Sequence, residues 1–187
     1  MKYLLKNCRN GEDAVYKTEL EITEKDGRLF FRFRAENSQY YCPHENYNDI
    51  HSEGDACEIL IGSDPERRFY YEIEINPKGR LMLAKMEYCG VDENGDPMLN
   101  IHFVEDCFLD SRTALFDNGY EAEISFDKKD IMTGDGEIYF NAYRLETDGG
   151  EMEKHLFALL PTMRGKFHVP SKYDYVQKFI DSSTTKR

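Results

Sequence analysis

The stretch Gly54–Gly79 constrains the fold of this chain most, because apolar and polar residues alternate on both sides of a short polar segment. The two alternating runs are Ala56–Ile61 and Phe69–Asn76, and Asp64 and Pro65 lie between them. A period of two on either side of turn residues is typical of an antiparallel β-hairpin. The sequence therefore predicts a hairpin with one apolar face that enters a core.

The opposite face of this hairpin gathers acidic side chains. Successive side chains of a strand point to opposite faces, so Glu58, Glu72 and Glu74 share the face opposite the isoleucines. Like charges opposite one another destabilise a sheet. The acidic face therefore needs cations, a metal ion, sugar hydroxyls or water as its partners, and the pattern leaves these alternatives open.

Similar short runs recur along the chain, with turn residues between them. The predicted strands are 13–23, 28–36, 56–61, 69–76, 80–88, 100–108, 120–126, 137–146, 155–160 and 176–180. One short helical turn is expected within residues 125–132. Many short strands with almost no helical pattern predict an all-β protein, an antiparallel β-sandwich. We expect a single domain over residues 1–187, with a core of about 13–180 and a flexible C-terminal tail.

Two connections are distinctive. Residues 37–53 lose the alternation and collect tyrosines and histidines, which is typical of either a functional loop or a surface cover packed on the sheet. The run Asp92–Pro97 contains Asn-Gly and predicts a hairpin turn. It lacks the alternating oxygen ligands and the closing glutamate of an EF-hand, so a calcium loop is the weaker interpretation.

The charge of the chain limits its partners. The sequence has 36 acidic and 24 basic residues, a formal net charge of −12. Nucleic acid phosphates and anionic membranes would repel such a protein within a Debye length of about 10 Å. We therefore expect no nucleic acid and no membrane partner, whereas calcium and neutral ligands are compatible with this charge.

The compartment is predicted from the amino terminus and the cysteines. The apolar run Tyr3–Leu5 is too short for a signal peptide, and no stretch approaches the roughly 20 apolar residues of a membrane span. Five cysteines without a CxxC pair predict free thiols. The expected location is cytoplasmic, or extracellular if an export signal has been removed.

Catalysis is the weaker interpretation of the acidic face. Glu58 and Glu74 on neighbouring strands would meet the separation of about 5 to 10 Å between the carboxyl groups of glycoside hydrolases. No nucleophile elbow or glycine-rich phosphate loop accompanies them. On the strand 137–146, the guanidinium of Arg144 would either relieve the carboxylate repulsion or form a structural ion pair elsewhere.

Four segments resemble carbohydrate-binding module family 9 (CBM9) in order, spacing and motif type. They are DACEILIG (Asp55–Gly62), YYEIEINPKG (Tyr70–Gly79), FNAYRLE (Phe140–Glu146) and LFALLPTMRGKFHVPSKYDYV (Leu156–Val176). The resemblance implies a jelly-roll-like β-sandwich without catalytic activity. It also implies binding of sugars or polysaccharide chain ends, structural calcium, and a glycoside hydrolase as a partner.

The resemblance also implies a binding site. The glutamate of the family's D-x-x-E run contacts the sugar, which indicates Glu58 with Asp55 in support. Family members clamp the sugar between two tryptophans, but this chain has none. Ser52 and Phe167 fall near those positions, and a loop tyrosine would replace the missing half, which predicts weak binding. The predicted ligand-binding residues are Glu58, Glu74, Asn141, Arg144, Phe167, His168, Asp55 and Tyr47, and no catalytic residue is predicted.

The predicted function is therefore non-catalytic carbohydrate binding, with a saccharide as the ligand and a glycoside hydrolase or another protein as a partner. One alternative is a protein-interaction sandwich that has lost its sugar site. It predicts an exposed apolar patch of Tyr40, Tyr41 and Tyr47. A glycoside hydrolase is the other alternative.

Overall fold

The computed structural model describes residues 1–37, 39–50, 53–133, 136–150 and 154–180. Within these residues the strands form two antiparallel sheets that pack face to face. The five-stranded sheet has the order β1 (Lys2–Leu4), β3 (Thr18–Lys25), β4 (Arg28–Glu36), β10 (Gly119–Asp127) and β9 (Asp110–Phe116). The eight-stranded sheet has the order β2 (Lys6–Asn7), β12 (His155–Ala158), β11 (Tyr139–Glu146), β5 (Ala56–Gly62), β6 (Phe69–Ile75), β7 (Leu81–Val91) and β8 (Pro97–Phe103), and β13 (Asp174–Tyr175) pairs with β11.

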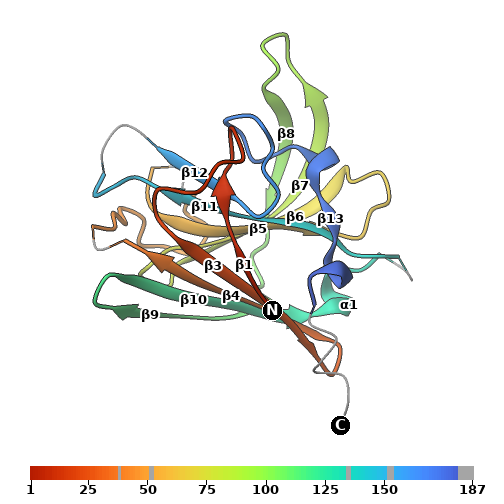
Figure 1. The fold of residues 1–187 in the computed structure, drawn as a ribbon. Helices are drawn as coiled ribbons and strands as arrows, with labels where there is room; N and C mark the ends of the chain where they lie inside the picture. Colours follow the sequence, from red (N-terminus) through yellow and green to blue (C-terminus); the bar gives the residue numbers. More distant parts are fainter. Residues whose placement is uncertain (38, 51–52, 134–135, 151–153, 181–187) are drawn as a thin grey trace.

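Figure 1 shows these sheets as two layers, with β4, β9 and β10 below β5, β6 and β11. The predicted all-β antiparallel sandwich is confirmed. No helix in the described part of the chain is long and apolar enough to cross a membrane. All five cysteines are free thiols, as the sequence predicts.

The main core lies between the two sheets. The hairpin β5–β6 supplies its isoleucines and β4 supplies phenylalanines, and all are fully buried in one cluster: Ile59, Ile61, Ile73, Ile75, Phe31 and Phe33. Burying each such side chain contributes roughly 1.5–3 kcal/mol. The apolar face of the predicted hairpin therefore holds the two sheets together.

A second apolar cluster lies on the outer face of the eight-stranded sheet. Leu60, Tyr70 and Tyr143 belong to it, and residues 161–176, here called the C-terminal cover, contribute Tyr173 and Phe167. The ring of Tyr173 meets that of Tyr70 edge to face, with centroids 5.4 Å apart. Because the cover packs on this face, the polar side chains beside it are buried instead of solvated.

Two predicted strands near the chain ends differ from the structure. The prediction of a strand at 176–180 is wrong, since Val176–Lys178 forms a 3₁₀ turn, η2, whose Phe179 N–H donates to the Val176 carbonyl. The apolar residues at 176 and 179 have the spacing of a helical turn. At the amino end the first long strand begins at Thr18, and the short strands β1 and β2 precede it. Runs of two or three residues carry no detectable alternation.

The region after residue 100 also differs. Strand β8 ends at Phe103, and β9 was not predicted because it is an edge strand with mostly exposed side chains. Such a strand lacks the buried face that produces an alternating pattern. The turn at Asp92–Asp96 is confirmed, with Gly95 at φ +79°. The expected helical turn is confirmed as α1 (Lys128–Ile131).

Candidate binding site on the larger sheet

A pocket of about 340 Å³ lies on the outer face of the eight-stranded sheet. This volume is within the range of about 300–1,000 Å³ that is usual for small-molecule sites. Strands β5, β6 and β7 form its floor, β8 forms one wall, and the C-terminal cover forms another. Its lining residues include Glu58, Glu72, Glu74, Met82, Met86, Pro97, Leu99, Ile101, Phe103, Leu156, Lys166, Phe167 and His168.

Three carboxylates form the polar floor of the pocket. Glu58 lies directly opposite Glu74 in the β5–β6 ladder, and Glu72 is two residues from Glu74 on the same face. Their residues are only 5, 7 and 7% exposed for Glu58, Glu72 and Glu74. The predicted acidic face is thus confirmed, and its side chains are removed from bulk water.

Glu58 is the most unusual of the three. Its Oε1 is buried and has no hydrogen-bond partner among the described residues. Burial raises the pKa of the Glu58 carboxyl well above its usual range, and the nearby Glu72 and Glu74 raise it further. An ionised Glu58 would therefore be stabilised by a hydrogen-bond donor or a cation that enters the pocket.

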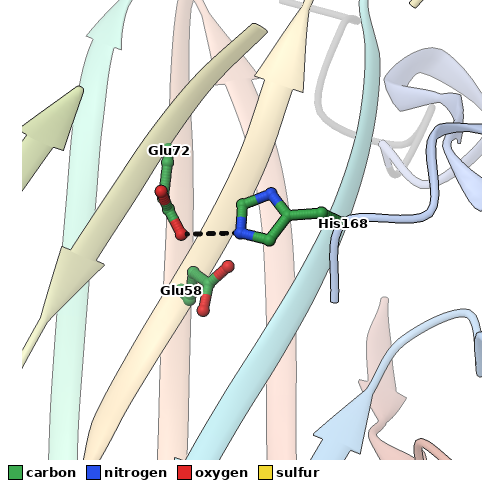
Figure 2. A group of neighbouring side chains, drawn as sticks. All are labelled: Glu58, Glu72 and His168. Atoms are coloured by element: carbon green, nitrogen blue, oxygen red, sulfur yellow. Dashed lines mark ion pairs between the residues drawn. The ribbon is translucent and has the colours of Figure 1, made fainter. Parts of the chain in front are cut away.

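His168 reaches the carboxylates from the C-terminal cover. Its Nε2 lies 3.3 Å from Glu72 Oε1, and its Nδ1 lies 2.9 Å from the Tyr70 hydroxyl. Figure 2 shows the imidazole directed at Glu72, with the Glu58 carboxyl beside it. A basic ring thus borders the acidic floor.

Phe167 forms part of the pocket wall. Its ring stacks on Tyr143 with centroids 4.3 Å apart and planes inclined by 22°, and the Tyr143 hydroxyl donates to the Phe167 carbonyl at 2.9 Å. These contacts fix the cover segment against β11. The pocket therefore contains Glu58, Glu74, Phe167 and His168, four of the predicted binding residues.

This architecture is similar to that of several solved structures. No family model and no curated protein matches the chain by sequence. Among solved structures, a "putative carbohydrate-binding protein" from Bacteroides uniformis superposes with a TM-score of 0.72 at 13% identity, over 92% of this chain and 84% of that one. A CBM9 from Caldicellulosiruptor kristjanssonii in complex with glucose superposes with a TM-score of 0.57 at 11% identity, over 92% and 82% of the two chains.

The cellotriose complex of a CBM9 from the same organism gives a TM-score of 0.55 at 10% identity, over 84% of this chain and 71% of that one. The chain has a CBM9-like fold. The resemblance of the four sequence segments is thereby confirmed at the level of the fold.

The CBM9-like sheet places Arg144 away from the pocket. In the β5–β11 ladder Arg144 lies opposite Cys57, whereas Glu58 lies opposite Tyr143. Arg144 and Glu58 therefore point to opposite faces of the sheet. The expectation that Arg144 relieves the repulsion between Glu58 and Glu74 is wrong.

Arg144 instead lies fully buried between the sheets. Its guanidinium donates to Thr18 Oγ1 at 2.9 Å and to the Glu36 carbonyl at 3.2 Å, and it forms an ion pair with the buried Glu146. The alternative of a structural ion pair is the correct one.

Asn141 and Asp55 are also structural. Asn141 is fully buried, its amide donates to the Tyr143 hydroxyl and the Leu160 carbonyl, and its Oδ1 accepts from the Leu160 N–H. Asp55 is fully buried and accepts from the Tyr41 N–H and from Thr147. Internal groups occupy both side chains, and neither residue lines the pocket, so their ligand roles stay predictions.

Tyr47 does not cover the pocket. Its hydroxyl donates to the Val104 carbonyl at 2.6 Å, and burial, with nearby Cys107, raises its pKa to about 12. Ile50, from the same loop, lines the pocket instead. Ser52, the other position considered for the clamp, lies outside the described residues.

The pocket includes residues that the sequence analysis did not select as ligands. One of them is Glu72. Strand parity puts it on the same face as Glu58 and Glu74, so the sequence pattern could have predicted it as a site residue. In the β8 wall, Leu99 precedes the predicted strand 100–108, and Phe103 lies within it, but no sequence signal placed that strand beside the acidic face.

Calcium, which the resemblance implies, prefers ligands that are all oxygen. Among the described residues, one group of at least three His, Cys, Asp or Glu side chains converges closely enough to hold an ion, and it includes the imidazole of His168. This group does not fit a calcium site. Structural calcium stays a prediction.

Proposed function

We propose that this CBM9-like domain binds a saccharide in the pocket, without catalysis. The observation that carries the proposal is the buried Glu58 carboxyl, whose Oε1 has no partner among the described residues and which lies on the pocket floor. A carboxylate accepts strong hydrogen bonds from hydroxyl groups in such an environment. The glucose and cellotriose complexes of the CBM9 structures, which share this fold, support the choice of ligand class.

The walls of the pocket complement the two kinds of surface on a sugar. Glu58 and Glu74 supply acceptors for hydroxyl groups, whereas Phe167, Leu99 and Phe103 supply apolar surface for the C–H faces. Phenylalanine offers less area than the tryptophans of the family. We therefore expect weak binding that depends strongly on the carboxylates.

The test is calorimetric titration of the protein with glucose, cellotriose and a broad panel of oligosaccharides. Glu58→Gln keeps the shape of the side chain but removes its charge, and a lost charge-assisted hydrogen bond costs about 1.5–3 kcal/mol, or roughly 10- to 150-fold in affinity. The matched control is Glu121→Gln on the opposite sheet, which should bind as the wild type does. A folded wild-type protein that binds no member of the panel contradicts the proposal.

The geometry of the acidic pair also has features of a glycoside hydrolase, so the test includes that alternative. Glu58 and Glu74 are paired directly across the ladder, and the pKa of Glu58 is raised chiefly by burial, as the acid of a glycoside hydrolase requires. We expect no turnover of aryl glycosides. A turnover that Glu58→Gln abolishes would establish an enzyme instead.

The protein-interaction alternative rests on the loop tyrosines. Tyr41 and Tyr47 are 41 and 39% exposed. If sugars fail and a co-purifying protein, such as a glycoside hydrolase, is lost with Tyr41→Ser, this surface and not the pocket carries the function.

A further inference from the structure

Glu58, Glu72 and His168 converge on one point of the pocket floor. One ligand atom of each lies within 4.8 Å of the others. Figure 2 shows the two carboxyl groups and the imidazole facing a common space. In a tetrahedral zinc site with Zn–N and Zn–O distances of about 2.0–2.2 Å, ligand atoms lie roughly 3.3–3.6 Å apart. The 3.3 Å between His168 Nε2 and Glu72 Oε1 already has this separation.

A second feature separates this group from an ordinary acidic cluster. The Oε1 atom of Glu58 is buried and accepts no hydrogen bond from the described residues, and the whole residue is only 5% exposed. A buried polar atom without a partner is costly. A cation on the pocket floor would satisfy it, and it would also remove the repulsion between Glu58 and its neighbours Glu72 and Glu74.

The imidazole is already oriented as metal ligands usually are. The Nδ1 atom of His168 lies 2.9 Å from the hydroxyl of the buried Tyr70, while Nε2 faces Glu72 at 3.3 Å. Metal-binding histidines usually hydrogen-bond through the nitrogen that does not bind the metal, which fixes the tautomer and the ring. With a proton on Nδ1 donated to Tyr70, the lone pair on Nε2 points at the carboxylates.

Two lysines lie in the pocket, and neither is a hydrogen-bond partner of Glu58 Oε1. They are Lys154 and Lys166, and Lys166 forms an ion pair with Asp96.

We propose that Glu58, Glu72 and His168 bind one first-row transition-metal dication, and that Zn²⁺ fits best. Imidazole and carboxylate together suit zinc, whereas calcium and magnesium prefer oxygen alone. Three protein ligands leave a fourth position for water or a ligand oxygen. The inference does not depend on the binding of a saccharide.

The experiment uses the full chain, freed of metal by a chelator and dialysis, and no sugar is added. Titration with ZnCl₂ should show one saturable site and raise the melting temperature, because an ion that binds the native state stabilises it. Affinity should increase with pH, since the ligands must be deprotonated to bind the ion. Calcium at the same concentrations should neither bind there nor displace zinc.

Variants assign the site. His168→Gln and Glu72→Gln should each weaken zinc binding by at least about 10- to 100-fold, the loss seen when even an outer-shell partner is removed. His102→Gln, an exposed histidine on β8, is the matched control and should bind as the wild type does. Circular dichroism of each variant confirms that the fold is retained.

Cobalt(II) reports on the ligand atoms. A visible d–d absorption without a thiolate charge-transfer band supports the nitrogen and oxygen ligands. A thiolate band would place the ion on a cysteine, and unchanged binding by His168→Gln or equal affinity for calcium would overturn the proposal.

Discussion

The buried ion pair of Arg144 with Glu146 offers the sharpest test of the structure. Arg144→Met removes a guanidinium that is fully buried and bonded to Thr18 and Glu36 of the other sheet. Glu146 then stays buried with Asn37 and the Asp148 N–H as donors. The substitution therefore leaves one charge in the core without its opposite.

The expected cost is large for a single substitution. Breaking a buried pair by removing one partner costs about 3–5 kcal/mol. For a protein of this size each kcal/mol lowers the melting temperature by about 2–4 °C, so the decrease should be roughly 6–20 °C. Arg34→Met, which breaks the exposed pair with Glu121, is the control and should cost less than about 1 kcal/mol.

The loss should also depend on pH. Burial raises the pKa of Glu146, and Arg144 opposes that increase. Without Arg144 the folded-state pKa rises further above the unfolded value, so stability is retained at low pH and lost as pH rises through the folded-state pKa. Urea unfolding of Arg144→Met should therefore show a larger deficit at pH 8 than at pH 5.

A double variant completes the test. Arg144→Met with Glu146→Met removes both charges and should recover most of the stability, because apolar replacements of a buried pair are often neutral. The reasoning is refuted if Arg144→Met unfolds at the wild-type urea concentration at both pH values. A loss of saccharide affinity without any loss of stability would return Arg144 to the ligand site.

Three further substitutions test the pocket and the sheet. In metal-free protein, Glu58→Gln should raise the melting temperature more at pH 8 than at pH 5, because burial and the neighbouring acids raise the pKa of Glu58, so its ionisation costs stability as pH rises; equal shifts would contradict this. Asn141→Ala leaves the Leu160 N–H without its acceptor and should cost about 1–3 kcal/mol in urea unfolding, with unchanged ligand affinity in the folded protein. Gly119→Ala would press a methyl group against the Ala35 carbonyl and should cost about 1–3 kcal/mol, and a wild-type melting temperature would show that the strands are not so close.

The local alternation of residues 56–76 was sufficient to predict the β5–β6 hairpin and its two faces. The isoleucines of these strands alternate with Glu58, Glu72 and Glu74, and the structure places them in the core and the pocket as that alternation predicts. Side-chain parity is a local property of an extended backbone. It does not depend on the conformation of the rest of the chain.

The sequence did not determine the faces of β11. Its residues YFNAYRLE carry apolar side chains at both parities, so the alternation does not say which face is the core. Only the pairing of Arg144 with Cys57 directs the guanidinium between the sheets and Tyr143 toward the pocket. Register between strands far apart in sequence depends on packing against the other sheet, which a local pattern does not contain.

Which side chains face the pocket floor depends on how the C-terminal cover packs on the sheet. The family resemblance selected Phe167, but the contact of His168 with Glu72 exists because Phe167 stacks on Tyr143 and Tyr173 packs on Tyr70. The cover has no alternating pattern, and its position follows from the shapes of aromatic rings on the finished sheet. Local polarity thus set which side chains form the floor, and long-range packing set what faces them.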